Sequence, residues 1–330
     1  MDSADYYYHK SLNKFIEIDA LVEEGKVNHH LAIIQSYRGN FDKAHEIVDL
    51  NLEFFTNEVL DSTMLLRFYS MQAGIHINQT NYKAGIESAL KSLELAEKLK
   101  NKVRKAHALK DLADLYHYTG NEEQAIKYEK EALAIYEEMN DKIFIANILN
   151  DLGNTHYGLG RYQEALEYLE RSLPISEEIE AKSLIAITCS NIGKTLVILG
   201  HIDQGIVYFE RSLQISRHVT KIPRNEVWAL KHLGDAYNKL NQPHKALPFL
   251  NRAVPIAHSI GIQDDLYGSL QKRSISYELL GNLSYAFKDF KRFEAVKDTV
   301  YNIEKTKEIE RLTMVFETKK KRTAISPSRK

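Results

Sequence analysis

The sequence predicts an all-α fold, a solenoid of stacked helical hairpins, from three observations. The chain has 330 residues, of which 44% are hydrophobic and 27% charged, with six prolines and fifteen glycines. This composition is more typical of helical proteins than of turn-rich β proteins. A turn-type residue followed five positions later by a small residue recurs at seven places, and between these places apolar residues follow helical spacing. A fixed period of this length indicates a repeat architecture.

The turn residue of each repeat, which we call its anchor, recurs at an almost constant interval that varies by a single position. The anchors are Gly39, Thr80, Gly120, Gly160, Gly200, Asn241 and Gly281. The small residues five positions after them are Ala44, Gly85, Ala125, Ala165, Gly205, Ala246 and Ala286, and those seven before are Ala32, Ala73, Ala113, Gly153, Gly193, Gly234 and Ser274. We expect each anchor to end a first helix with positive φ, and the small residues to let the two helices of a hairpin cross closely.

Two further expectations concern the second helices. Replacing Ala165 with Phe should overpack a crossing at a cost of about 1–3 kcal/mol. Pro174 and Pro255, both fourteen positions after an anchor, should kink or interrupt their helices.

The two ends differ from the repeats. Residues 1–22 predict a leading helix, either a cap or the second half of a repeat whose first half is missing, and residues 23–290 hold seven repeats. From about residue 284 to about 320 no proline or glycine interrupts the chain, which predicts one long helix. Residues 291–321 are therefore assigned to a C-terminal linker or capping helix, and residues 322–330 to a disordered basic tail.

The residues around the anchors resemble the tetratricopeptide repeat family. Its Leu-Gly-x-x-Tyr, Gly, Ala pattern is seen at residues 112–116 with Gly120 and Ala125, and at 233–237 with Asn241 and Ala246. The resemblance covers about residues 24–290 and implies a right-handed superhelix whose first helices line a concave face. The period of about forty positions resembles the longer subclass found in peptide-sensing scaffolds and bacterial signalling proteins. Residues 297–318 resemble the segment that joins such a sensor to its output domain.

Composition and motifs argue against several function classes. A formal net charge of −1 does not favour a nucleic-acid binder, and the basic run at residues 319–322 is typical of a solvated tail. Cys189 is the only cysteine, which excludes an intramolecular disulfide, and we expect it buried in the fifth repeat. The chain shows no signal-peptide pattern and no apolar run of roughly 18–20 residues, so we expect no membrane span and a cytoplasmic location.

No motif indicates catalysis. The stretch from Gly153 to Gly160 follows helical spacing and lacks the Lys-Ser or Lys-Thr of a phosphate loop. The thirteen histidines are scattered and form no zinc motif. We therefore expect no cofactor, no metal and no enzyme activity.

The candidate binding residues lie at the positions thirteen, ten, six and three before each anchor, which share one face of the first helix. The predicted set is Arg67, His107, Lys110, Asp114, Asn147, Asn150, Asn154, Tyr157, Lys194, Trp228, Lys231, Asp235, Asn238 and Gln271. His29 and Ser70 occupy equivalent positions. The column of Asn147, Asn150 and Asn154 suggests amides that bind an extended peptide backbone, although tolerance of polar residues on an exposed face would give the same pattern. Trp228 is either an apolar anchor for a ligand or a packing residue.

The pairs Lys110–Asp114 and Lys231–Asp235 predict intrahelical salt bridges, not the family's terminal-carboxylate clamp, which needs asparagine where these acids stand. The sequence thus predicts a non-catalytic scaffold that binds a peptide or protein segment, as the sensor module of a bacterial signalling protein. Two alternatives stay open. One is a peptide-responsive, phosphatase-like regulator, against which the short N-terminal region argues; the other is an assembly module that forms a homodimer through its C-terminal helix.

Overall fold

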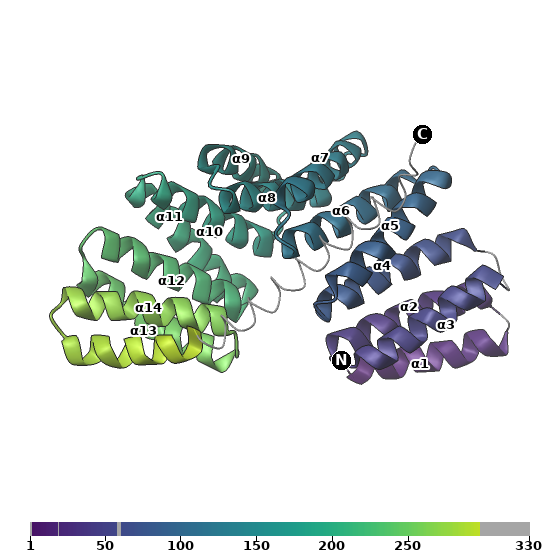
Figure 1. Ribbon diagram of the computed structural model, residues 1–330, viewed down its shortest axis with the longest axis horizontal. Helices are drawn as coiled ribbons and strands as arrows, with labels where there is room; N and C mark the ends of the chain where they lie inside the picture. The colour runs from purple at the N-terminus through teal and green to yellow at the C-terminus, as the bar shows by residue number, and fades with distance from the viewer. Residues whose placement is uncertain (1, 19, 58–60, 298–330) are drawn as a thin grey trace, which may run out of the picture. The chain divides into compact units, whose positions relative to one another are not determined.

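The computed structural model describes residues 2–18, 20–57 and 61–297, and its described residues form helices and turns without a strand. The helices run antiparallel in hairpins along the chain (Figure 1). Their bounds are α1 Asp2–Glu17, α2 Leu21–Tyr37, α3 Phe41–Asn57, α4 Ser62–Asn78, α5 Tyr82–Lys98, α6 Lys102–Tyr118, α7 Glu122–Glu138, α8 Lys142–Gly158, α9 Tyr162–Glu178, α10 Lys182–Ile198, α11 Ile202–Ile215, η1 Ser216–Thr220, α12 Pro223–Lys239, α13 Pro243–Ser259 and α14 Gln263–Leu279. A further helical segment covers residues 283–297, and the rest of the predicted C-terminal helix lies outside the described residues.

The predicted turns are confirmed at every anchor. All seven anchors have a positive φ, between 56° at Asn241 and 90° at Gly200. At Gly160, with φ 73°, the turn is closed by two backbone bonds, from Gly160 N–H to Tyr157 O at 3.0 Å and from Arg161 N–H to His156 O at 2.9 Å. This geometry is a glycine-type helix end, which satisfies carbonyls that the last helical turn leaves unpaired.

A second column of left-handed residues joins one hairpin to the next. Its members are Lys100, Asn140, Glu180, Lys221 and Gly261, which are spaced at the same interval as the anchors. The sequence did not indicate this column, because only one of its members is glycine. Non-glycine residues reach this conformation only at a cost in free energy, so packing of the flanking helices must hold them there.

The predicted close crossings are confirmed by the burial of the small residues. Ala32, Ala73, Ala44, Ala125 and Ala165 are at 0% exposure. A very tight approach joins α10 and α11, where a methyl group placed on Gly193 would lie 2.9 Å from the Gly205 carbonyl oxygen. Only a residue without a side chain fits there.

Buried serines tie the two helices of a hairpin together. Ser172 Oγ donates to Ala146 O at 2.7 Å, and Ser212 Oγ donates to Ala186 O at 2.8 Å, one repeat later. Both serines are at 0% exposure. Each hydroxyl is thus paired, as burial of a polar group requires.

The expectation for the prolines was wrong in one respect. Pro174 lies inside α9 and Pro255 inside α13, and neither interrupts its helix. Both prolines lie in the final turns, so each helix loses one backbone hydrogen bond near its end while the packing of its buried face is retained.

The interval from Gly200 to Asn241 is one residue longer than most of the intervals between anchors, and the structure shows where this additional residue is accommodated. Between Gly200 and Asn241 the second helix ends in the π-helical turn η1, and Lys221 follows with φ 54°. A π turn takes one more residue than an α turn, so the insertion is absorbed there.

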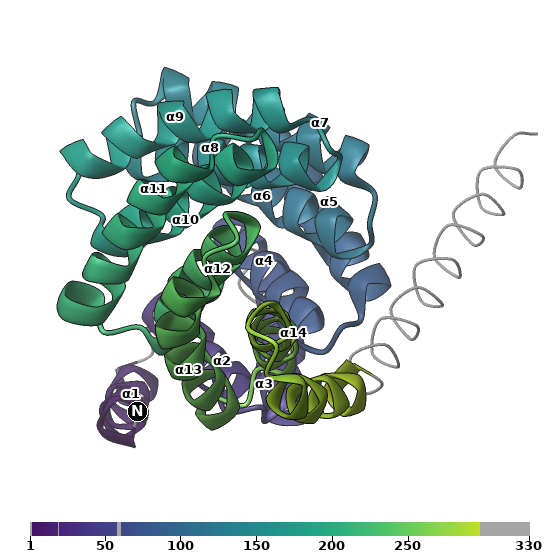
Figure 2. The ribbon, with the colours of Figure 1, turned by 90° about the vertical axis from the view of Figure 1, so that its left-hand side faces the viewer.

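The described array divides into two compact units, with the boundary between Met139 and Asn140. Unit 1 has a core of Val48, Phe55, Met64 and Phe68, among others. In unit 2, α12, α13 and α14 pack together and lie side by side in both views (Figure 1, Figure 2). The first helices also pack on one another within each unit, as α2 does on α4 and α10 on α12. Among the described residues no helix is long and apolar enough to cross a membrane.

Candidate functional site

The fourteen predicted residues all lie on first helices, and the structure buries them more than expected. Asn150 and Asn238 are buried and the other twelve are half-buried. The reason is that each first helix packs against the first helix of the next repeat within its unit, which covers one edge of the polar face. Four of them (Arg67, His107, Lys110 and Asp114) belong to unit 1, and the other ten belong to unit 2.

In unit 1, three consecutive first helices line a cavity of about 430 Å³. The predicted residues His107 and Asp114 line it, together with His29 and Ser70. The remaining lining residues are Ile33, Ser36, Tyr37, Met71, Gly74, Ile75, Ile77, Asn78, Arg104 and Asp111. A volume of this size is typical of a ligand pocket with apolar walls and a few polar groups.

Arg104 and Asp111 are functional candidates that the sequence reasoning missed. They lie three positions before and four after His107, so the helical spacing used for the other positions would have placed them on the same stripe. They were missed because only four positions per repeat were considered.

The charged groups of this cavity perturb one another. Burial raises the pKa of Asp111 to about 7, with a further rise from the Asp114 charge, against the opposing effects of Lys110, Ser70 and Arg104. Burial lowers the pKa of His29 to about 4, helped by His30 and the two arginines Arg67 and Arg104. Perturbed groups in a cavity are typical of functional sites.

The two predicted salt bridges have different outcomes. Lys110 Nζ lies 2.7 Å from Asp114 Oδ2, so the first pair is confirmed. The second prediction was wrong, because Lys231 Nζ lies 2.9 Å from Asp265, on α14, and Asp235 pairs with Lys272 at 3.0 Å. Both partners come from the next repeat, which spacing within one helix cannot reveal.

The asparagine column of α8 is engaged in bonds within the protein. Asn150 Oδ1 accepts from Thr188 Oγ1 at 3.2 Å and from Asn191 Nδ2 at 3.1 Å, both on α10. Asn147 Nδ2 donates to the Ile143 carbonyl of its own helix at 2.7 Å. The Asn150 amide oxygen therefore joins two repeats.

Lys194 is the most strongly perturbed predicted residue of unit 2. Its Nζ lies 3.8 Å from the centre of the Tyr157 ring and donates to Asn154 Oδ1 at 3.3 Å. Burial, followed by the charge of Lys231, lowers the pKa of Lys194 to about 8. The ammonium group thus faces an aromatic ring. The attraction between a cation and a ring is stronger when the pair is shielded from water.

Trp228 shares a partner with Lys231. The indole Nε1–H donates to Asp265 Oδ1 at 2.8 Å, and Arg224 lies 5.0 Å from the centre of the ring. Asp265 is 2% exposed, so its charge is compensated by these donors and not by water.

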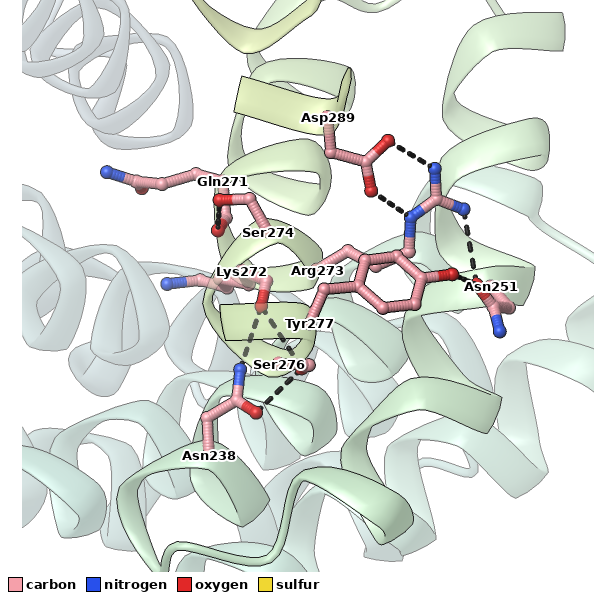
Figure 3. A network of polar contacts seen from close by, with 9 residues as sticks. All are labelled: Asn238, Asn251, Gln271, Lys272, Arg273, Ser274, Ser276, Tyr277 and Asp289. Atoms are coloured by element: carbon pink, nitrogen blue, oxygen red, sulfur yellow. Dashed lines mark hydrogen bonds and ion pairs between the residues drawn. The ribbon is translucent and has the colours of Figure 1, made fainter. Parts of the chain in front are cut away.

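A polar network surrounds Asn238 and α14 (Figure 3). Asn238 Nδ2 donates to the Lys272 carbonyl at 2.8 Å, and Ser276 Oγ donates to Asn238 Oδ1 at 2.7 Å. Figure 3 shows the side chain of Gln271 pointing away from this network and from Arg273. Of the two predicted residues, Asn238 thus joins neighbouring repeats, and Gln271 projects from the α14 surface.

Two side chains outside the predicted set, Cys189 and His117, have raised pKa values. Cys189 is buried as predicted, and burial raises the pKa of its thiol to about 11. His117 Nδ1 lies 2.8 Å from Glu122, and that hydrogen bond raises the pKa of the imidazole. Within the described part of the chain, no group of three or more His, Cys, Asp or Glu side chains is arranged to hold a metal ion.

Comparison with known proteins agrees with this architecture. The sequence matches the tetratricopeptide repeat family over residues 65–138, 144–218 and 184–259. No curated protein matches the sequence significantly.

Solved structures share the fold. The apo form of RapI is 17% identical, with a TM-score of 0.69, and the match covers 98% of each chain. A signal transduction ATPase with a tetratricopeptide repeat sensor, from Pyrococcus horikoshii, is 17% identical with a TM-score of 0.72 over 93% of this chain and 46% of that one, so this chain spans about half its length. The apo quorum sensor NprR from B. thuringiensis is 14% identical with a TM-score of 0.58, over 90% and 98% of the two chains.

Proposed function

We propose, from the premise that this chain belongs to the tetratricopeptide repeat family, that it is a non-catalytic scaffold that binds a peptide or an extended protein segment. The observation that supports this most is the unit 1 cavity, because three consecutive first helices contribute polar and apolar side chains to one hollow of ligand size. The half-buried polar stripe of α8, α10 and α12 in unit 2 offers a second stretch of such surface. A segment bound in either unit would contact the half-buried predicted residues of that unit, a set that leaves out the buried Asn150 and Asn238.

We further propose a sensing role. Two structures that share the fold are named as sensors, one a quorum sensor and the other a tetratricopeptide repeat sensor. Hydrogen bonds between consecutive repeats, such as those of Asn150 and Asn238, couple the first helices on which a ligand would sit. Binding would therefore alter the packing of neighbouring repeats.

The test is selection of peptides from a displayed random library on the purified protein, followed by affinity measurement of the selected peptides. Substituting Asn147→Ala and Lys194→Ala removes polar groups from the first helices without touching the buried Asn150. The control substitutes Glu167→Ala and Val207→Ala on the second helices α9 and α11, where Val207 is 64% exposed. We expect the first variant to lose affinity about tenfold or more for peptides bound along unit 2, and the control to retain it.

Two outcomes would contradict the proposed binding surface. If no peptide is enriched on the folded protein, or if both variants bind every selected peptide as the unchanged protein does, the proposed stripe is not a binding surface.

A further inference from the structure

We propose that His45, His76 and Gln79 bind a divalent transition-metal ion, Ni²⁺ or Cu²⁺, where the first repeat packs on the second. The ion would tie the second helix of one repeat to the first helix of the next. Such a site goes beyond peptide binding and is independent of it, so either property can be present without the other.

The fold brings together two histidines that no sequence motif connects. His45 lies on α3 and His76 on α4, and the centres of their rings are 4.7 Å apart. Gln79, which follows α4, has its Oε1 2.7 Å from His45 Nε2. All three side chains are half-buried. The third ligand is an amide, so this site differs from the groups of three His, Cys, Asp or Glu side chains that the described residues lack.

In later repeats the positions of the three proposed ligands are apolar and pack together. Counted from the anchors, these positions are six after one anchor, and four before and one before the next. Between the fourth and fifth repeats they hold Leu166, Leu196 and Leu199, which pack in one hydrophobic cluster. One repeat later they hold Ile206, Tyr237 and Leu240, again in one cluster. The first pair of repeats thus has metal-binding atoms where apolar side chains serve the packing elsewhere.

The protein leaves these imidazoles incompletely paired. His76 Nδ1 is buried and has no hydrogen-bond partner. Among the described residues, the bond to Gln79 is the only hydrogen bond of the His45 ring. A neutral imidazole carries a lone pair on one nitrogen, which is the atom that binds a metal. An ion shared by the two rings would use lone pairs that the fold does not otherwise engage, and it would offset the cost of burying them.

The distances fit an ion whose ligands lie at right angles. Bonds between a metal and a histidine nitrogen are about 2.0–2.1 Å long. An ion in place of the proton between His45 Nε2 and Gln79 Oε1, which are 2.7 Å apart, would bind these atoms at an angle of about 80°. Two imidazoles bound at a right angle have ring centres about 4.5 Å apart, close to the observed 4.7 Å. Right angles are typical of the tetragonal and octahedral sites of Cu²⁺ and Ni²⁺, and not of tetrahedral zinc sites.

The charges around the pair favour a bound cation. Burial, followed by the charge of His45, lowers the pKa of His76, against the opposing effects of Gln79, Asp49 and Glu87. The His76 ring is therefore kept neutral, the form that binds metals. The carboxylate of Asp49, on α3, also accepts from Gln72 Nε2 at 3.0 Å. A metal ion would supply positive charge near two carboxylates without protonation of the ring.

The test adds Ni²⁺, and separately Cu²⁺, to the whole chain in a buffer that does not bind metals. Calorimetric titration gives the affinity and the number of ions bound, and thermal unfolding gives the midpoint with and without the ion. His45→Leu and His76→Leu introduce the residue that later repeats have at these positions, so both variants should fold, with midpoints in the absence of metal equal to or above that of the unchanged protein. His30→Leu is the matched control, because His30 is an exposed histidine of unit 1 whose ring centre lies 5.6 Å from that of His29.

We expect the unchanged protein and His30→Leu to bind one Ni²⁺ ion per chain with equal affinity. His45→Leu and His76→Leu should each bind it about tenfold or more weakly, because each variant loses a ligand. Cu²⁺ should bind more tightly than Ni²⁺. Since the ion binds the native state, it should raise the unfolding midpoint of the unchanged protein and of His30→Leu, and leave those of the two ligand variants unchanged.

Three results would overturn the proposed metal site. Equal affinity in the unchanged protein and all three variants would mean that the ion is held adventitiously by other histidines. An equal loss of affinity in His30→Leu would place the ion at the His29 and His30 pair, and an absence of binding by the folded, unchanged protein would exclude a site altogether. None of these results bears on peptide binding, which the display experiment tests separately.

Discussion

At the scale of single residues, the carboxyl group of Asp111 links the cavity to the stability of the protein. The pKa of this group is raised from its ordinary value of 3.8 to about 7, first by burial and then by Asp114. The native state therefore binds a proton more tightly than the unfolded chain does, and the contribution of Asp111 to stability falls as the pH rises from about 4 to about 7.

Asp111→Asn should remove this dependence. We expect the free energy of unfolding of the variant to exceed that of the unchanged protein at pH 7, and the difference to shrink as the pH approaches 4. Urea unfolding between pH 4 and 8 measures it. A difference that stays constant over this range would show that the carboxyl group titrates as an exposed acid does.

His29 should behave in the opposite sense. Burial lowers its pKa from 6.5 to about 4, so the native state binds its proton less tightly and stability is lost as the pH falls from about 6.5 to about 4. His29→Asn should reduce that loss in the same urea experiment. A variant whose acid sensitivity matches that of the unchanged protein would contradict this.

Cys189 provides a direct probe of burial. Its side chain is at 0% exposure and its thiol pKa is raised to about 11, so the reactive thiolate is scarce and shielded at pH 8. We expect iodoacetamide to leave the native protein unlabelled and to label it fully in denaturant, as mass spectrometry would show. Rapid labelling of the native protein would mean that α10 opens readily.

The environment of a single residue was predicted correctly for Cys189 and wrongly for Lys231. Cys189 was correctly predicted to be buried, because it occupies a small-residue position of a helical repeat. Lys231 was assigned to Asp235 because the two share one helix face a single turn apart, whereas its partner Asp265 stands one repeat later, on the next first helix. Pairing between repeats depends on how the hairpins stack, and a single period does not specify which side chains then meet.

At the scale of elements, the close crossing of α10 and α11 depends on glycine. A methyl group on Gly193 would lie 2.6 Å from the Phe209 ring and 2.9 Å from the Gly205 carbonyl oxygen. Gly193→Ala should therefore lower the free energy of unfolding by about 1–3 kcal/mol.

The matched control for that change is Gly158→Ala at the end of α8, where an added methyl group meets nothing within 4 Å. Because alanine favours helix, this variant should be neutral or stabilised by up to about 1 kcal/mol. Both are measured by the midpoint of urea unfolding. Equal midpoints for the two variants would contradict the close crossing.

At the turns between hairpins, replacing a residue by glycine should stabilise the protein. Glu180 is exposed and has φ 53°, a conformation that costs a residue with a side chain about 1 kcal/mol or more. Glu180→Gly should stabilise the protein by roughly that amount, and Asn140→Gly by less because asparagine tolerates this conformation better. Differential scanning calorimetry would detect the order of the two effects, and a loss of stability in Glu180→Gly would count against it.

The helices were predicted from sequence more completely than the joints, by which we mean the left-handed turns that connect one hairpin to the next. The anchors were found because glycine or asparagine stands at most of them, and each marks the end of a first helix. The joints at Lys100, Glu180 and Lys221 carry no such residue, so only the fold shows their left-handed backbone. The π-helical turn was equally hidden, since an interval one position longer than the others reveals an insertion but not its place.

At the scale of the whole molecule, stability in a repeat array is shared between neighbours, each hairpin contributing through its own packing and its interface with the next. The boundary between Met139 and Asn140 falls at one of the left-handed joints. The sequence predicted one continuous array over residues 23–290, since a period describes each repeat and carries no information on where packing is weaker. The cavity of unit 1 was only partly foreseen for the same reason, because it needs the side chains of three helices at once.

The bond between Trp228 and Asp265 has a spectroscopic consequence. Trp228 is the only tryptophan of the chain and lies in unit 2. Indole emission therefore originates from the contact between α12 and α14, and unit 1 contributes none. Loss of the 2.8 Å hydrogen bond to a carboxylate would change the surroundings of the indole and hence its emission. Following indole fluorescence and circular dichroism together during denaturation would therefore time the loosening of a single interface against the melting of all helices.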